Sequence, residues 1–271
     1  MPGVLALHTW TLDSTPLAEV LRIARRTGWD AVELRRVDFA RAAEKGQSAG
    51  DVLDLVRKSG LAVACVGLEG GWIFAEGAER QRKFEACEES CRWANELDCP
   101  LVMSPADRGP GDPDRAARSV REMGEIVAKH GLKLAMEFNS QAEFLKSLDR
   151  MRDVLARAKH PNCGLLMDSY HLQRSGNHPR VLADLAPGEI TYVQYSDVPK
   201  DGLKPGAITD RLPPGKGIVP FAEFFRMVQD RGYRGYLSYE APNPSAWARN
   251  PEEVLREALL ATRALLPPSS Q

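Results

Sequence analysis

Short apolar runs alternate with longer amphipathic segments along the whole chain. We count eight such runs, each apolar on both faces, as the strands of a covered parallel sheet require. They span residues 4–8, 31–34, 61–67, 101–104, 133–137, 164–168, 190–195 and 235–240. This alternation predicts repeated strand–helix units around a parallel sheet.

The amphipathic segments between the strands carry helix start and stop signals. Helices are expected over residues 16–27, 78–97, 113–130, 142–158 and 251–265. Three of them begin with a capping side chain just before a proline, at Thr15-Pro16, Asp112-Pro113 and Asn250-Pro251. Eight units predict a single (β/α)8 barrel domain over residues 1–271. A doubly wound open sheet is the alternative, but no G-x-G-x-x-G turn or P-loop supports it.

Composition and charge exclude several classes of protein. The chain has 36 basic and 37 acidic residues, so it lacks the positive charge expected of a nucleic-acid-binding protein. Its five cysteines are odd in number and have no C-x-x-C spacing, which favours a reducing compartment. The start MPGVLALHTW has no basic segment of a secretory signal, and no apolar run is long enough for a membrane span. We therefore expect a cytoplasmic protein without membrane or nucleic-acid partners, and the sequence leaves self-association into a homo-oligomer open.

Polar residues end the last four predicted strands. Glu137 ends the fifth strand, Asp168 the sixth with His171 just beyond it, Gln194 lies near the end of the seventh, and Glu240 ends the eighth. Barrels of this kind build their active sites at the carboxyl ends of the strands, so these side chains are expected to converge. For each residue alone, capping of the next helix or a surface ion pair is the competing interpretation.

Three carboxylates in one funnel would repel one another unless a cation lies among them. We therefore predict a divalent metal ion held by Glu137, Asp168, Gln194 and Glu240. Oxygen ligands favour Mg²⁺ or Mn²⁺, with Co²⁺ or Zn²⁺ as alternatives. His8, which ends the first strand, and Trp72, which follows the third, are expected to face the same funnel and bind a polyol. Plain packing is the alternative for both. The pair Arg35-Arg36 is interpreted as solvated or helix-capping charge without a role.

At these strand ends the chain resembles the xylose-isomerase-like TIM barrel superfamily of sugar phosphate isomerases and epimerases, over essentially its whole length. The resemblance rests on an acid ending strand five, a D-x-x-H pattern at strand six, an H-x-[HQ]-x-x-[DE] pattern at strand seven and a glutamate ending strand eight. The corresponding residues are Glu137, Asp168 to His171, Tyr192 to Asp197 and Glu240. The chain departs from the pattern at Tyr192, where histidine is common. Its Gln194 is more similar to hydroxypyruvate isomerases and 3-dehydroshikimate dehydratases than to ketose 3-epimerases.

The resemblance implies further substrate contacts. The segment from Arg211 to Gly217 is similar to the R-x-x-P-G-[EK]-G loop of the superfamily, which implies that Arg211 reaches the substrate. Glu143 matches a substrate-contacting acid of the epimerases, although it fits equally an exposed position at the start of the next helix.

Such a site suits removal of a proton next to a carbonyl, with the metal stabilising an enediolate. Glu137 and Glu240 are the expected acid and base, and His171 and Arg211 would orient substrate oxygens. The leading hypothesis is a metal-dependent sugar isomerase or epimerase acting on a small polyhydroxylated carbonyl substrate. The alternative is a dehydratase of the 3-dehydroshikimate or inosose type, in which loss of a β-hydroxyl follows the same first step. Weaker readings are a non-catalytic sugar-binding barrel and an endonuclease IV-like enzyme, which would need more than the five histidines present.

Overall fold

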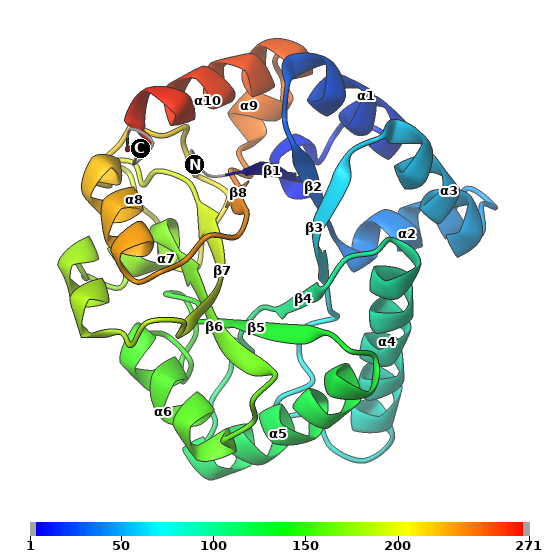
Figure 1. Ribbon diagram of the computed structural model, residues 1–271, viewed down its shortest axis with the longest axis vertical. Helices are drawn as coiled ribbons and strands as arrows, with labels where there is room; N and C mark the ends of the chain where they lie inside the picture. The colour runs from blue at the N-terminus through cyan, green and yellow to red at the C-terminus, as the bar shows by residue number, and fades with distance from the viewer. Residues whose placement is uncertain (1–3, 268–271) are drawn as a thin grey trace.

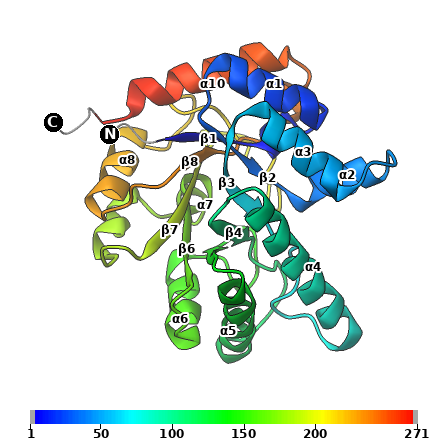
Figure 2. The same ribbon diagram turned by 45° about the vertical axis from the view of Figure 1, so that its right-hand side comes forward.

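A computed structural model describes residues 4–267 as a closed barrel of eight parallel strands in sequence order, surrounded by helices (Figures 1 and 2). Every neighbouring pair is parallel, and β8 closes the ring against β1. The predicted (β/α)8 fold is thus confirmed, and the open-sheet alternative is wrong. The strands are β1 (Leu5–His8), β2 (Ala31–Leu34), β3 (Ala62–Gly67), β4 (Leu101–Ser104), β5 (Lys133–Glu137), β6 (Cys163–Asp168), β7 (Ile190–Tyr195) and β8 (Leu237–Tyr239).

The helices that follow the strands form the outer layer (Figure 1). Within residues 4–267 they are η1 (Thr9–Leu12), α1 (Leu17–Thr27), α2 (Arg36–Ala43), α3 (Ala49–Ser59), α4 (Gly77–Glu96), α5 (Pro113–Lys129), α6 (Leu148–Ala158), α7 (Ser169–Arg174), η2 (Pro179–Asp184), α8 (Phe221–Asp230), α9 (Pro244–Trp247) and α10 (Pro251–Leu265). In this part of the chain, none of the helices has both the length and the apolar character needed to cross a membrane.

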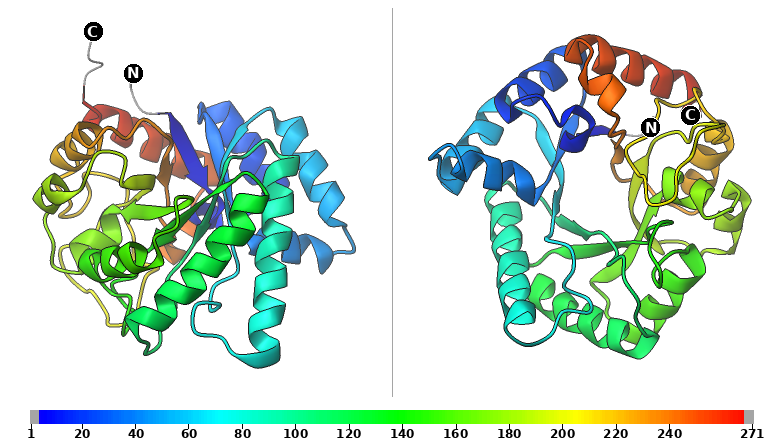
Figure 3. Two further views of the ribbon diagram at one scale, coloured as in Figure 1. Left: turned by 60° about the horizontal axis from the view of Figure 1, so that its bottom comes forward. Right: turned by 180° about the vertical axis from the view of Figure 1, so that it is seen from behind.

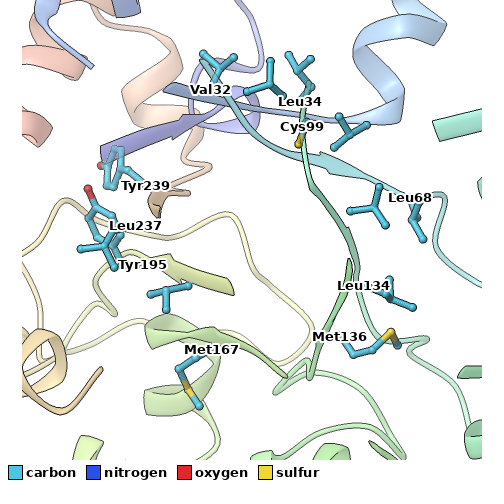
Figure 4. Close-up of a cluster of buried hydrophobic side chains, with 14 of the residues drawn as sticks. Val32, Leu34, Leu68, Cys99, Leu134, Met136, Met167, Tyr195, Leu237 and Tyr239 are labelled. Carbon is cyan, nitrogen blue, oxygen red and sulfur yellow. The ribbon is translucent and has the colours of Figure 1, made fainter. Parts of the chain in front are cut away.

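Side chains alternate along each strand between two separate apolar cores. Leu134 and Met136 of β5 point outward into the large core under the helices, together with Leu237 and Tyr239 of β8 (Figure 4). The residues between them point into the barrel, where Ala135 joins a small inner core. Because this alternation continues to the strand ends, it also decides which polar side chains enter the barrel.

Local signals set most helix boundaries. The side chain of Asn250 accepts hydrogen bonds from the first turn of α10, and Asp112 caps α5 in the same way, as predicted. Gly28 and Gly60 have positive φ and end α1 and α3. The prediction of a helix from residue 142 is wrong, because α6 begins only at Leu148, after the capping residue Ser147. The residues before it form a loop instead.

The longest irregular segment lies between β7 and α8 and folds back over the carboxyl end of the barrel (Figure 3). Asp197 fixes this segment. Its backbone forms an isolated antiparallel bridge with Leu212, and its carboxylate accepts hydrogen bonds from the backbone N–H groups of Val198, Gly217 and Val219. These contacts place Arg211, next to the bridge, over the strand ends.

Candidate active site

Six polar side chains point into the barrel at its carboxyl end, and none is more than 5% exposed. Five of them lie two residues after an inward-facing apolar residue of their own strand. The sixth directly follows an outward-facing residue, so it also points into the barrel. The six are His8 of β1, Glu33 of β2, Glu137 of β5, Asp168 of β6, Gln194 of β7 and Glu240 directly after β8. Strand register aligns His8 with Glu33 and Asp168 with Gln194. Sequence reasoning identified five of the six and missed Glu33.

A cavity of about 570 Å³ opens above these side chains. His8, Glu137, His171, Arg211 and Glu240 line it. Its remaining wall is mostly apolar and includes Leu68, Met103, Pro105, Ala106 and Ile208. Both predicted acid–base glutamates therefore face one space that is large enough for a small ring or short-chain substrate.

Arg211 lies at the centre of the site with only 2% of its surface exposed. Its Nη1 donates to Asp168 Oδ2 at 2.7 Å and to Glu240 Oε2 at 3.1 Å, and its Nη2 lies 3.2 Å from His171 Nε2. The guanidinium also stacks over the ring of Tyr170, with Cζ 4.3 Å from the ring centroid. Arg211 thus reaches the cavity as expected, and it neutralises the carboxylates as well.

Burial dominates the electrostatics of the carboxyl groups. Burial, together with the negative charges of Glu240 and Asp168, raises the pKa of Glu137 well above its usual value, although Arg211 opposes the shift. Burial also raises the pKa of Asp168, against the opposing effect of the Arg211 charge. A bare cluster of this kind tends to hold protons, and an added cation would favour its ionised form.

The donor atoms fit a divalent ion. Atoms of Glu137, Asp168 and His171 lie within 4.8 Å of one another, all three residues being buried. Among the described residues, Glu137 Oε1 and Gln194 Oε1 are buried oxygens with no hydrogen-bond partner. An unpartnered buried oxygen is costly unless it binds a ligand. The structure therefore adds His171 to the residues that could ligate an ion, beside the predicted Glu137, Asp168, Gln194 and Glu240.

Asp168 has a second role that the competing interpretation anticipated. Its Oδ1 accepts a hydrogen bond from the backbone N–H of Tyr170 at 2.9 Å, so the side chain caps α7. This short helix places His171 beside the carboxylates. Helix capping and membership of the site are therefore not alternatives at this position.

The two histidines of the site differ in what faces their ring nitrogens. The backbone N–H of Trp10 donates to His8 Nδ1 at 3.1 Å, so the proton of neutral His8 lies on Nε2. At His171 both ring nitrogens face donors, because the backbone N–H of Ser140 donates to Nδ1 at 3.3 Å and Arg211 Nη2 lies 3.2 Å from Nε2. Burial, followed by the charges of nearby arginines, lowers the pKa of both rings well below the usual value. His8 is thus a hydrogen-bond donor toward the site.

Two predicted substrate contacts lie outside the cavity. Trp72 is fully buried, donates from its indole Nε1 to Ser104 Oγ at 2.8 Å and packs edge-on against Phe84. Its ring has no accessible face on which a substrate could stack, so the expectation of stacking is corrected to a packing role. Glu143 is exposed and does not line the cavity.

The structure also places cationic residues that the sequence reading left without a role. Arg35, Arg36 and Arg108 all line the cavity. Arg35 pairs with Asp13 at 2.8 Å and Arg36 with Glu89 at 2.5 Å. Arg108, in the loop after β4, forms no side-chain ion pair or hydrogen bond with any residue between 4 and 267. Arg108 lies in a loop beyond the end of β4, where neither strand periodicity nor a motif marks it, so only the tertiary structure could assign it to the cavity.

Comparison with known proteins agrees with this architecture. The chain is 30% identical over 247 residues to 3-dehydroshikimate dehydratase of Pseudomonas aeruginosa, a match covering 88% of this chain and 38% of that protein. The chain therefore spans less than half the length of this relative. It is 21% identical to inosose isomerase of Bacillus velezensis, with 94% of each chain covered.

Among solved structures, the IOLI protein with a bound zinc atom superposes with a TM-score of 0.86 at 17% identity, covering 98% of each chain. The model of the family described as xylose isomerase-like TIM barrel matches residues 21–265. With a match of that extent, the chain belongs to the xylose isomerase-like TIM barrel family.

Proposed function

We propose that this protein is a metal-dependent isomerase or epimerase that removes a proton next to the carbonyl of a small polyhydroxylated substrate. The observation that carries the proposal is the arrangement of two carboxyl groups that face one cavity and are linked through a single cluster. Glu240 contacts Arg211, Arg211 contacts His171, and His171 Nε2 lies 3.7 Å from Glu137 Oε1. Its relatives include isomerases and a dehydratase, which supports an enzymatic role.

Glu137, Asp168, Gln194 and Glu240 would hold the ion, with His171 as a further donor. Mg²⁺ or Mn²⁺ suits the predominance of oxygen donors. When bound, a divalent ion would polarise the substrate carbonyl and stabilise the negative charge that develops as the proton leaves.

The side chains would divide the remaining work. One of Glu137 and Glu240 would take the proton and the other would return it, because both reach the cavity. His8 would donate a hydrogen bond from Nε2 to a substrate oxygen, and the positive charge of Arg211 would compensate the negative charge of the carboxylates. The apolar wall would exclude water from the reacting carbon.

A dehydratase is the second candidate, and Arg108 favours it. An arginine without an acidic partner at the cavity wall would suit a substrate with a carboxylate. 3-Dehydroshikimate carries such a group, as does the isomerase substrate hydroxypyruvate, whereas inososes and simple ketoses do not. The 30% identity to a 3-dehydroshikimate dehydratase points the same way.

The test is to incubate the protein, loaded with Mg²⁺ or Mn²⁺, with ketoses, inososes, hydroxypyruvate and 3-dehydroshikimate in D₂O and to follow the products by NMR. Deuterium incorporated next to the carbonyl without loss of water supports isomerisation or epimerisation, and loss of water supports the dehydratase. Binding of these compounds without exchange or turnover would refute both and support a sugar-binding barrel. Protein treated with a chelator and protein reloaded with each metal are the controls.

A further inference from the structure

Glu33 is a buried carboxyl that the proposed chemistry does not use. It lies on the inner face of β2, is 0% exposed and does not line the cavity. A carboxyl group in such a place is costly to bury unless donors surround it. Tyr192 Oη donates to Oε2 at 3.0 Å, and Gln194 Nε2 donates to Oε1 at 2.9 Å.

The bond to Gln194 determines how its side-chain amide is oriented. The two ends of an amide differ in chemistry, because the nitrogen only donates and the oxygen only accepts. Glu33 Oε1 accepts this hydrogen bond, as the carbonyl oxygen of a protonated carboxyl group does as well as a carboxylate oxygen, so it selects the nitrogen of Gln194 and turns the amide oxygen away from itself. That oxygen, Gln194 Oε1, is buried and has no partner among residues 4–267. Strand register places Gln194 beside Asp168, another expected metal ligand.

A purely structural role for Glu33 would leave this oxygen unexplained. If Glu33 and Gln194 only satisfied each other in the core, the amide oxygen would be expected to find a donor, as buried polar atoms generally do. A hydrogen bond from a carboxylate to a metal-binding side chain is, in contrast, a common way to fix the direction of its ligand atom. Glu33 has a second polar neighbour in His8, whose Nε2 lies 3.7 Å from Glu33 Oε1.

We propose that Glu33 is a positioning residue that holds the Gln194 amide with its oxygen toward the divalent ion. This inference rests on the proposed function only in assuming that the ion binds at this site. Replacing Glu33 by glutamine keeps the shape but puts an NH₂ group in place of one oxygen. That group can donate to Gln194 Oε1 and so compete with the ion.

The experiment is a double-mutant cycle read as Mn²⁺ affinity by titration calorimetry. The variants are Glu33→Gln, Gln194→Ala and the double variant, with His8→Ala and Glu33→Gln/His8→Ala as a second cycle. We expect Glu33→Gln to weaken Mn²⁺ binding about 10- to 100-fold. In the Gln194→Ala background, the same change should alter affinity less than about twofold, since the side chain on which Glu33 acts is gone. In the His8→Ala background, the full loss should persist.

Equal losses with and without Gln194 would overturn the inference, as would a loss that disappears only with His8→Ala. Glu125→Gln, the same chemical change at an exposed site on α5, is the matched control, and thermal unfolding checks that each variant is folded. Absence of Mn²⁺ binding by the wild-type protein would instead refute the metal site itself. Failure of the positioning role and failure of the proposed function thus give different results.

Discussion

The two halves of the barrel mouth differ in kind. The ends of β5–β8 provide the acidic cluster of Glu137, Asp168 and Glu240, all deeply buried. The loops after β2–β4 provide a wall of apolar residues together with Arg35, Arg36 and Arg108. The first half carries the groups of the proposed proton transfer, and the second lines the rest of the cavity. Catalysis and specificity should therefore respond to different mutations.

The contrast has an electrostatic origin. Arg211 compensates the buried acids of the first half, and Asp13 and Glu89 compensate Arg35 and Arg36 in the second. Arg108 is the cavity arginine left without such a partner in the described part of the chain. An unpaired cation next to an apolar wall can discriminate between substrates with and without an anionic group.

The largest effect is expected at the acid–base pair. Glu240→Gln or Glu137→Gln should lower kcat about 10²- to 10⁴-fold with little change in KM, because a carboxyl that transfers a proton is lost while the cavity keeps its shape. Steady-state kinetics on the substrate found in the NMR screen measure this, with Glu125→Gln on α5 as the control. A Glu240→Gln variant as fast as wild type would remove Glu240 from the mechanism.

A smaller effect is expected in the second half. Arg108→Ala should raise KM for a carboxylate substrate about 10- to 100-fold, because a charge-assisted hydrogen bond is lost. The KM for a neutral inosose should stay within about twofold of the wild-type value. Arg108→Lys should recover part of the affinity because it keeps the charge. Equal increases in KM for both substrates would contradict a role of Arg108 in recognising an anion. They would also argue against separate roles for the two halves.

The pH dependence of stability tests the buried acid that links the halves. Burial, followed by the charge of Glu240, raises the pKa of Glu33 to about 8. Between its usual pKa near 4.5 and about 8, the folded chain therefore holds a proton that the unfolded chain has lost. The contribution of Glu33 to the free energy of unfolding is fully present below its usual pKa near 4.5 and is lost as the pH rises through about 8.

In chelator-treated protein, the free energy of unfolding should thus fall between about pH 5 and pH 8, with Glu33 contributing up to about 1.4 kcal/mol per pH unit. The Glu33→Gln variant should show a shallower slope in urea unfolding measured across this range. Since Glu137 has a shift of the same sign, the difference between the two proteins isolates Glu33. Identical slopes would mean that Glu33 is ionised in the folded chain.

The smallest effect is expected at Trp72. Trp72→Phe keeps an aromatic ring in the core but removes the hydrogen bond to Ser104, so it should destabilise the fold by about 1 kcal/mol. The KM should not change, since the ring does not reach the cavity. Chemical unfolding and kinetics measure the two quantities separately. A rise in KM without a loss of stability would restore the stacking role inferred from the sequence.

The sequence predicted the site best where strand periodicity acts alone. Glu137, Asp168, Gln194 and Glu240 each end an apolar strand, and the register of the barrel brings them together as expected. Glu33 obeys the same rule, because it alternates with Val32 and Leu34 inside an apolar strand, and the period of two could have identified it. Glu33 precedes the last residue of its strand and belongs to none of the family motifs, so neither a strand-end signal nor a motif marks it.

By itself, the sequence determined the barrel, the order of its strands and the inward direction of the strand-end acids, because these follow from local periodicity and from the sterics of parallel sheets. Only the tertiary structure decided what depends on long-range contacts. The fold inserts Arg211 among the acids, buries Trp72, turns Glu143 to solvent and joins Glu33 to Gln194 across 161 residues. Loop paths and hydrogen bonds between distant strands are set by packing in three dimensions, which no short stretch of sequence specifies.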